Sequence, residues 1–303
     1  MNKVVAIVVV YNGMKWLSKC FESLDKSKIS LHIIAIDNNS SDGSAEYLQE
    51  KFPHVELICS SENIGFARGN NMGLKRALEL DADHVFLLNQ DAWINTNTIS
   101  ELLSASYNNI DYGILSPIHF SSQELSLEKQ FLQFLSDQNT EQFINDCYFG
   151  KLQSIYETKY IHAAAWLITR ACLNRVGGFD PLFYHYGEDD DYMQRAKHFG
   201  FNLGIVTKAS FSHDSINKTW EMIEWDKSRN LFSAYLSLKK MVPNFRSNLL
   251  IYFKNTFDEL TTLLLLRKWR KFVLKMSIFF TVMTKLNLIY NSYRASFKEG
   301  NFL

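Results

Sequence analysis

The first 118 residues alternate short apolar runs with amphipathic stretches. The first run, Val4–Val10, is almost entirely β-branched, which favours a strand buried on both faces of a parallel sheet. Apolar residues at helical spacing follow at Trp16–Leu24. The alternation continues, with strands predicted at Leu31–Ile36, Val55–Cys59, His84–Leu88 and Tyr112–Ile118 and helices at Ala45–Lys51, Arg68–Leu80 and Ile94–Tyr107. This order predicts an α/β fold with a mostly parallel central sheet flanked by helices.

The pattern changes in the second part of the chain. Residues 121–158 lose the β pattern, whereas Tyr160–Ile168 and Asn202–Val206 again look like strands. Glu188–Phe199 has the spacing of a helix, and the pattern is helical from about Trp220 to the last residue. We therefore expect an α/β domain at residues 1–239, with halves at about 1–118 and 119–239, and a helical extension at 240–303.

The chain has 303 residues and a formal net charge of zero, with 32 Lys and Arg against 32 Asp and Glu. This balance argues against a dedicated nucleic-acid binder, which usually has a basic excess. The four cysteines are far apart, with no C-x-x-C pair, so we expect a reducing compartment and hence a cytoplasmic protein. The neutrality hides an asymmetry: residues 240–303 have a net charge of +8 and residues 1–239 one of −8.

Residues 246–295 combine Leu, Phe and Ile with Lys and Arg at helical intervals, as in Leu263–Leu266 followed by Arg267–Lys271. A basic amphipathic surface of this kind suits anionic lipid, which would place the protein peripherally on the inner face of the cell membrane. The alternative is a helical hairpin that packs on the α/β domain or on a second subunit. No apolar window approaches the roughly 18 residues of a membrane-spanning helix, so we expect none.

Several polar groups follow predicted strands directly. Asp37, the loop Glu62–Asn71 and Asn89-Gln90-Asp91 would all lie at the carboxyl edge of the sheet, where open parallel sheets bind ligands. The structural alternatives are that Asp37 shapes a turn and that Asp91 caps the next helix. Glycine-rich dinucleotide and P-loop motifs are absent from the sequence. A nucleotide bound here would need a divalent cation on carboxylates, and Asp91 could reach one.

Two further places could support chemistry. Glu188–Asp191 is a run of four acids that follows the aromatic stretch Phe183–Tyr186. Burial among rings would raise the pKa of a carboxyl group, which suits a general base, whereas the alternative is solvated charge at a helix N-terminus. His213 follows a strand, and it gains importance only if the fold brings it near Asp91.

Together these motifs resemble the family 2 glycosyltransferases of the GT-A fold, and within them the rhamnosyltransferase-like branch. Each piece alone is weak, but eight in the family's order and spacing over about residues 4–230 form a specific signal. The matching pieces are Val8–Asn12, Ile36–Ser44, Glu62–Gly73, Leu88–Asp91, Gly177–Asp180, Tyr186–Asp191 with Arg195, His213, and Arg229-Asn230. The last seventy residues are not covered by this resemblance.

The resemblance implies roles for individual residues. Tyr11 and Asp37 would hold the base and ribose of a nucleotide-sugar donor, and Arg68 and Asn71 would line the same pocket. Asn89, Gln90 and Asp91 would stand at the family's D-x-D position, with Asp91 and His213 holding Mg²⁺ or Mn²⁺. Asp189 would be the catalytic base of an inverting displacement.

The resemblance also implies a reaction. The expected donor is a dTDP- or UDP-sugar, with dTDP-rhamnose as one candidate. The expected acceptor is a saccharide, lipid-linked if the tail binds membrane, in cell-surface polysaccharide synthesis. Asn89 and Gln90 stand where the branch commonly has Asp and Pro, which leaves the donor open. The alternatives are a degenerate domain that binds a nucleotide sugar or glycan, and a sugar nucleotidyltransferase. Trp166 would pack either on a sugar ring or in the core.

Overall fold

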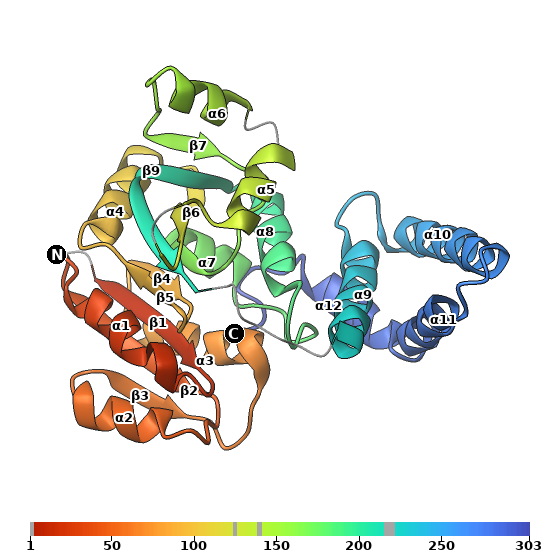
Figure 1. The fold of residues 1–303 in the computed structure, drawn as a ribbon, viewed down its shortest axis with the longest axis horizontal. Coiled ribbons are helices and arrows are strands. Elements are labelled where there is room, and N and C mark those ends of the chain that lie inside the picture. The colour runs from red at the N-terminus through yellow and green to blue at the C-terminus, as the bar shows by residue number, and fades with distance from the viewer. Residues whose placement is uncertain (1–2, 124–125, 138–140, 215–221) are drawn as a thin grey trace.

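The computed structural model describes residues 3–123, 126–137, 141–214 and 222–303 of the chain (Figure 1). A nine-stranded sheet has the order β3-β2-β1-β4-β8-β6-β9-β5, and the ninth strand, β7, pairs with β9. The strands are β1 (Val4–Val10), β2 (Leu31–Asp37), β3 (Glu56–Cys59), β4 (His84–Leu88), β5 (Ala92–Ile94), β6 (Tyr112–Ser121), β7 (Ile155–Glu157), β8 (Ala165–Thr169) and β9 (Asn202–His213).

Helices flank the sheet, and further helices follow its last strand in the sequence. The helices of the α/β domain are α1 (Met14–Asp25), α2 (Ser44–Lys51), α3 (Gly65–Glu79), α4 (Thr98–Asn108), α5 (Lys129–Asp137), α6 (Glu141–Tyr148), α7 (Arg170–Val176) and α8 (Glu188–His198). Those of the helical extension are α9 (Met222–Lys239), α10 (Phe245–Leu265), α11 (Trp269–Thr284) and α12 (Leu286–Ala295).

The sheet is buried on both faces, as the β-branched runs indicated. Along β1, Val5 and Ile7 belong to one hydrophobic cluster, and Val4, Ala6 and Val8 belong to the other. The first cluster includes residues of α3, α7 and α8, and the second includes residues of α1, α2 and α4. Because successive side chains of a strand point to opposite faces, a continuous apolar run places one helical layer on each side.

The strand directions are mixed but mostly parallel. Strands β1 to β4, β6 and β9 run in one direction, whereas β5, β7 and β8 run against them. The β8 strand, between β4 and β6, begins at Ala165 instead of the expected Tyr160. The expected α/β fold with a mostly parallel sheet and a helical extension is confirmed.

The expected start of the next helix at Ile94 is wrong. Residues Ala92–Ile94 pair with β9 as the short strand β5, and the helix begins only at Thr98. Asn97 lies at its N-cap position, so Asp91 does not cap this helix. Backbone hydrogen bonding to β9 took precedence over helix propensity here, because edge residues of a sheet find partners across the ladder.

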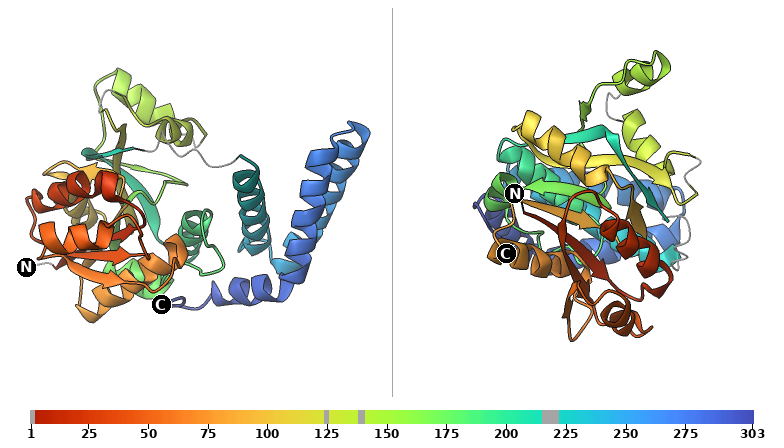
Figure 2. Two further views of the ribbon diagram at one scale, coloured as in Figure 1. Left: turned by 60° about the horizontal axis from the view of Figure 1, so that its bottom comes forward. Right: turned by 90° about the vertical axis from the view of Figure 1, so that its left-hand side faces the viewer.

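The extension forms a helical unit with its own core. Tyr235 and Leu238 of α9, Phe245 and Tyr252 of α10, and residues of α11 and α12 make a third hydrophobic cluster. Figures 1 and 2 show α10 and α11 as an antiparallel hairpin that extends away from the sheet domain. Since α9 packs with this unit, the predicted boundary at residue 239 falls inside a packed structure and stays a prediction.

The chain then returns to the α/β domain. The Gly178 N–H donates to the carbonyl of Asn301 at 2.9 Å, and the Asn71 side-chain amide donates to the carbonyl of Phe302 at 2.9 Å. The last residues therefore pack on the α/β domain, whereas the expected packing of the hairpin itself on this domain is not seen among the described residues. Among the described residues no single helix is long and apolar enough to cross a membrane, although α11 and α12 together, bent by 63°, pass the same test.

A buried ionic cluster joins the helical unit to α8. Lys239 at the end of α9 contacts Asp180 closely and donates to Asp191 at 2.6 Å. Asp191 also accepts from Arg195 at 2.8 Å, and Ser292 of α12 donates to Asp180. Each carboxylate thus has a charged partner and a further donor or cation, which buried charges require.

We predict that Lys239→Met lowers the free energy of unfolding by about 3–5 kcal/mol, because it leaves Asp180 buried without a cation and Asp191 with Arg195 alone. Lys239 is 0 % exposed, whereas its neighbour Lys240 is exposed, so Lys240→Met is the matched control and should change little. Chemical unfolding monitored by circular dichroism measures both. A loss below about 1 kcal/mol for Lys239→Met would show that this cluster does not support the fold.

Candidate functional site

The polar residues predicted for the sheet edge do lie at the ends of β2 and β4. Asp37 ends β2 and is buried. Its Oδ2 accepts from the Ser40 N–H at 3.1 Å, while Oδ1 is buried with no hydrogen-bond partner among the described residues. One oxygen therefore shapes the turn, as the structural alternative required, and the other remains available to a ligand.

Tyr11 and Gln90 bind one another across the ends of β1 and β4. The Tyr11 N–H donates to Gln90 Oε1 at 2.9 Å, and Gln90 Nε2 donates back to the Tyr11 carbonyl at 3.1 Å. A side chain at position 13 would place its Cβ 2.2 Å from Gln90 Oε1, so Gly13 is needed for this approach. The Tyr11 side chain remains 45 % exposed at this edge. Gln90 thus fixes the turn that presents Tyr11.

The start of α3 is held by Asn38. Asn38 Oδ1 accepts from the Ile64 N–H at 2.9 Å, and its Nδ2 donates to Asn63 Oδ1 at 2.9 Å. Arg68 is exposed in the first turns of this helix, where it could meet a ligand. Asn71 instead donates to the carbonyl of Phe179 at 2.8 Å and accepts from the Phe179 N–H at 2.7 Å. In this structure Asn71 therefore secures a loop and the chain end, and its donor-pocket role stays a prediction.

The fold brings Asp91 and His213 together. In the β5–β9 ladder Ala92 lies opposite His213, and the Asp214 N–H donates to the Asp91 carbonyl at 2.9 Å. His213 Nε2 lies 3.3 Å from Asp91 Oδ1. The condition that the sequence set for a role of His213 is thus met by the pairing of two strands.

A second carboxylate, Glu128, orients His213. His213 Nδ1 lies 3.0 Å from Glu128 Oε1, and His119 Nδ1 lies 3.3 Å from Glu128 Oε2. The two histidines hold the pKa of Glu128 well below its usual range, against the effect of burial. An ionised Glu128 only accepts, so Nδ1 of His213 is the donor and Nε2 faces Asp91.

The charge of the two histidines differs. Burial lowers the pKa of His119 to about 4 and outweighs its contact with Glu128. Burial acts on His213 in the same direction, but the carboxylates of Asp91 and Glu128 together outweigh it and raise its pKa to about 9. The two carboxylates therefore favour the protonated form of His213. His213 would bind a cation only after it loses this proton.

Asp91 and His213 fit a divalent cation that also binds a substrate. His213 is 4 % exposed, and its Nε2 has no hydrogen-bond partner among the described residues. Octahedral ligands at the usual Mg²⁺ distance lie about 3 Å apart, close to the 3.3 Å between these two atoms. The described residues include no group of three or more His, Cys, Asp or Glu that could hold a metal. A cation at this pair would therefore need phosphate oxygens or water as further ligands.

The four acids Glu188–Asp191 open α8 and have different surroundings. Asp189 is buried, and its Oδ2 accepts from the Tyr160 hydroxyl at 3.2 Å while its Oδ1 accepts from the Asp190 N–H at 2.9 Å. Asp191 belongs to the ionic cluster, and the pKa of Asp191 is lowered because Lys239 and Arg195 outweigh burial. Asp189 is thus held in place by two donors, and Asp191 has a structural role.

The expectation of raised pKa values in this run is met by its other two members. Burial, with repulsion from Asp189, raises the pKa of Glu188 well above its usual range. Burial, with repulsion from Asp189 and Asp191, raises the pKa of Asp190 to about 7. Burial, the cause that the sequence suggested, acts first, and repulsion between neighbouring carboxyl groups, which the sequence-based expectation did not include, adds to it.

The loop before α8 contacts the start of α3. The Phe66 N–H donates to the Tyr184 carbonyl at 3.3 Å, and the Tyr184 hydroxyl donates to the Asn63 carbonyl at 2.9 Å. The loop that precedes the acidic run therefore lies against the start of α3. Trp166 does not reach this region, since it is fully buried and stacks near Phe179 at 6.3 Å between ring centroids. Of the two expected roles for Trp166, the core role is the one observed.

Sequence reasoning missed Glu128, His119 and Tyr160. Glu128 precedes a helix in the part of the chain without a strand pattern, and it reaches His213 across 85 positions. No local pattern marks it. His119 lies on β6, opposite Phe211 of β9, and an acid facing two histidines could be found only with the strand pairing in hand.

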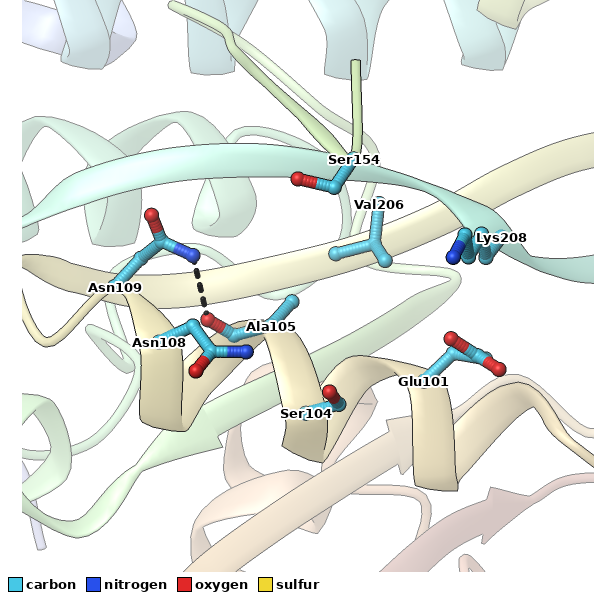
Figure 3. Close-up of a pocket in the computed structure, with 8 residues that line it drawn as sticks. All are labelled: Glu101, Ser104, Ala105, Asn108, Asn109, Ser154, Val206 and Lys208. Atoms are coloured by element: carbon cyan, nitrogen blue, oxygen red, sulfur yellow. Dashed lines mark hydrogen bonds between the residues drawn. The ribbon is translucent and has the colours of Figure 1, made fainter. Parts of the chain in front are cut away.

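A surface pocket of about 170 Å³ lies elsewhere on the domain. Figure 3 shows Glu101, Ser104 and Asn108 of α4, with Asn109 directly after it, across from Ser154, Val206 and Lys208. None of these residues is among the predicted site residues.

The fold and this edge of buried acids define a class of protein. A family model described as "Glycosyl transferase family 2" matches residues 5–177. The match covers more than half of the chain, and the chain belongs to this family. It extends from β1 through the last turn of α7, and so includes Asp37 and Asp91 but neither Asp189 nor His213.

Characterised relatives are distant. The "Low-salt glycan biosynthesis hexosyltransferase Agl10" of Haloferax volcanii is 25 % identical over 211 residues, which are 68 % of this chain and 64 % of that protein. The "N-acetylglucosaminyl-diphospho-decaprenol L-rhamnosyltransferase" of Mycobacterium tuberculosis is 23 % identical over 241 residues, 70 % of this chain and 76 % of that one. The match spans less than two thirds of Agl10 and 28 % of the length of "Glycosyltransferase GlyA" of Streptococcus pneumoniae.

A solved structure shares the fold. The crystal structure of residues 1–349 of S. aureus TarS superposes with a TM-score of 0.57 at 13 % identity, covering 81 % of this chain and 68 % of that one. At this identity the likeness shows the fold alone. The resemblance to family 2 glycosyltransferases of the GT-A fold is thus confirmed.

We predict that Asp190→Asn stabilises the protein at pH 8 and not at pH 4. The folded-state pKa of Asp190, about 7, lies above the value of about 3.9 for an unfolded chain. Ionised Asp190 therefore costs stability, and the stability present at low pH is lost as the pH rises towards 7. Thermal unfolding should show a rise of a few degrees at pH 8.

The matched control for this measurement is Asp111→Asn, because Asp111 is exposed. Its unfolding temperature should equal that of the wild type at both pH values. An equal rise for Asp190→Asn at pH 4 and pH 8 would contradict the electrostatic explanation and indicate a change in packing.

Proposed function

We propose that this protein is an inverting, metal-dependent glycosyltransferase that moves a sugar from a nucleotide-diphosphate donor to a saccharide acceptor in polysaccharide synthesis. The observation that carries the proposal is the approach of His213 Nε2 to Asp91 Oδ1, 3.3 Å apart, at the carboxyl edge of the sheet. Family membership supports the transfer chemistry. The names of two relatives, a glycan hexosyltransferase and a rhamnosyltransferase, support the substrate class.

Asp91 and His213 would hold Mg²⁺ or Mn²⁺. A divalent cation bound there would stabilise the charge that develops on the leaving diphosphate. Glu128 accepts from Nδ1 and thereby turns Nε2 of His213 towards Asp91. Orienting contacts of this kind commonly matter for metal affinity, so Glu128 and His119 serve as positioning residues.

Asp189 would remove the proton from the attacking acceptor hydroxyl. Tyr160 and the Asp190 N–H fix the orientation of the carboxylate, and orientation is a large part of general base catalysis. An inverting displacement needs the base on the face of the sugar opposite the leaving group. The Phe66 N–H donates to the Tyr184 carbonyl and so joins the loop before α8 to the start of α3, which supports this arrangement.

Tyr11, Asp37 and Arg68 would bind the nucleotide. Asp37 Oδ1 is a buried acceptor without a partner among the described residues, so a ribose hydroxyl could donate to it. The TarS structure has been solved with UDP-GlcNAc, which supports a UDP-sugar, and the name of the mycobacterial relative supports dTDP-rhamnose as a second candidate. Asn89 also has a buried unpartnered oxygen, Oδ1, and would contribute on the diphosphate side.

We predict that Asp189→Asn lowers the rate of sugar transfer at least about a hundredfold while nucleotide-sugar binding is retained. The amide keeps the shape of the side chain but cannot take a proton, and general base catalysis contributes about 10²–10⁴-fold. Transfer is measured as donor turnover with acceptor, and binding by calorimetry with the same donor.

Asp190→Asn is the control for this prediction, since it removes an adjacent acid that the proposal does not use, and transfer should stay within about tenfold of wild type. Wild-type turnover by Asp189→Asn would reject the base assignment. Binding of a donor by the wild type with no turnover of any acceptor would instead favour a degenerate binding module.

We predict that Asp91→Ala weakens nucleotide-diphosphate binding at least tenfold when Mn²⁺ or Mg²⁺ is present and leaves the weak metal-free binding unchanged. The substitution removes a hard oxygen ligand and leaves His213 as the single protein ligand. Titration of nucleotide diphosphate with and without Mn²⁺ measures this. Asp81→Ala, whose side chain is 93 % exposed, is the control, and metal-independent binding by the wild type would exclude the metal role.

A further inference from the structure

The hairpin tip, residues Leu264–Lys271, joins α10 to α11. We propose that the hairpin tip docks the protein on an anionic lipid bilayer, with its apolar side chains at the acyl boundary and its cations among the headgroups. Figures 1 and 2 show this turn at the end of the hairpin that points away from the sheet domain. Membrane binding through this segment does not depend on the proposed transfer reaction.

The apolar side chains of the tip are turned to solvent. Leu265 is 83 % exposed and Trp269 is 59 % exposed, and Leu264 and Leu266 are also exposed. Four large apolar side chains within six consecutive residues form a patch of the kind that monomeric proteins usually cover. Leucine and tryptophan are the residues that interfacial segments insert, leucine into the acyl boundary and tryptophan at headgroup level.

Four cations surround these side chains. Arg267, Lys268, Arg270 and Lys271 are all exposed, and the described residues offer none of them an ion pair. From Leu260 to Lys298 the sequence has no acidic residue. Glu259, the nearest acid along the chain from the tip, already pairs with Lys275 at 2.5 Å. The tip therefore has an uncompensated positive charge next to its apolar surface.

This charge distinguishes lipid from a second copy of the chain. In a symmetric dimer the same patch meets itself, so the four cations of one copy would face the four cations of the other. Like charges across an interface oppose association. An anionic bilayer supplies both an apolar phase and the opposite charge, and each Lys or Arg near its surface strengthens binding about fivefold.

The other end of the hairpin is anchored. Tyr252 of α10 and Ile278 and Val282 of α11 are buried in the helical core, together with Ile289 of α12. Ser292 of α12 donates to Asp180 in the buried ionic cluster. If α11 and α12 crossed a bilayer, these side chains would have to leave the protein core. Docking by the tip leaves them in place. The contacts thus favour a segment that lies at the interface.

The helical unit also contacts the loop that precedes the acidic run. Phe183 is part of the hydrophobic cluster of α9–α12, and it lies five residues before Glu188. A tip held at a bilayer would therefore keep α8 and Asp189 at a fixed distance from the lipid surface. This geometry suits an acceptor saccharide attached to lipid, and that last step alone rests on the proposed function.

The test is flotation of the full chain with vesicles, without donor or acceptor. Wild type should bind vesicles of phosphatidylcholine with phosphatidylglycerol and should bind pure phosphatidylcholine at least tenfold more weakly. The variant R267Q/K268Q/R270Q/K271Q should lose more than a hundredfold in affinity for the anionic vesicles. The matched control K240Q/R246Q/K285Q/K298Q removes the same charge from exposed positions outside the tip and should lose less than tenfold.

A second variant tests the apolar part. L265Q/W269Q changes two exposed side chains, so the fold should be retained, and its circular dichroism spectrum checks this. We expect this variant to lose at least tenfold in vesicle binding at high salt. Equal binding by wild type and both tip variants would overturn the proposal. The proposal would also be overturned if sedimentation showed a wild-type dimer that the tip variants convert to monomers, while neither the wild type nor the variants bound vesicles. A third result would overturn the proposal by showing a spanning segment. In this result, the fluorescence of Trp269 would be quenched by lipids brominated near the bilayer centre and not by lipids brominated near the headgroups.

Discussion

The buried contact of Lys239 with Asp180 and Asp191 connects the parts of this molecule. Asp191 lies on the helix that begins with Glu188 and Asp189, Lys239 ends the first helix of the extension, and Ser292 of α12 reaches the same cluster. Burying these charges costs desolvation energy, and well-packed apolar side chains in place of such an ion pair often give a protein at least the same stability. What the cluster supplies is one arrangement: the cation satisfies both acids only if α8 and α9 meet in this register. The position of the candidate base thus depends on a residue of the helical extension.

The candidate metal pair depends on a different constraint, the ladder between β5 and β9. Ala92 lies opposite His213, which brings the preceding residue, Asp91, to the histidine at 3.3 Å. Glu128 then fixes the ring from the other side. An edge strand of three residues is a small element, but its backbone hydrogen bonds leave no freedom in register, because a slip of one residue would turn His213 to the other face.

The periodicity of the sequence was sufficient for the α/β class, for most strands and for the sheet edge that carries Asp37 and Asp91. It was insufficient where tertiary pairing overrode local preference. Residues 92–94 became a strand because β9 offered backbone partners, and Asn71 was taken up by the backbone of Phe179 and Phe302. Trp166 entered the core because β8 lies between two strands and both of its faces are covered. The acid Glu128 had no local signal at all.

The sequence by itself determined the layers of this protein, since a continuous β-branched run can be buried only between two helical faces. It also determined the charge of the extension, because the absence of acids from Leu260 to Lys298 needs no fold to be read. Only the tertiary structure decided which acids pair with buried cations, and which apolar residues of the extension remain in solvent. Both questions concern neighbours that are distant in the chain, and desolvation and pairing depend on those neighbours rather than on residue type.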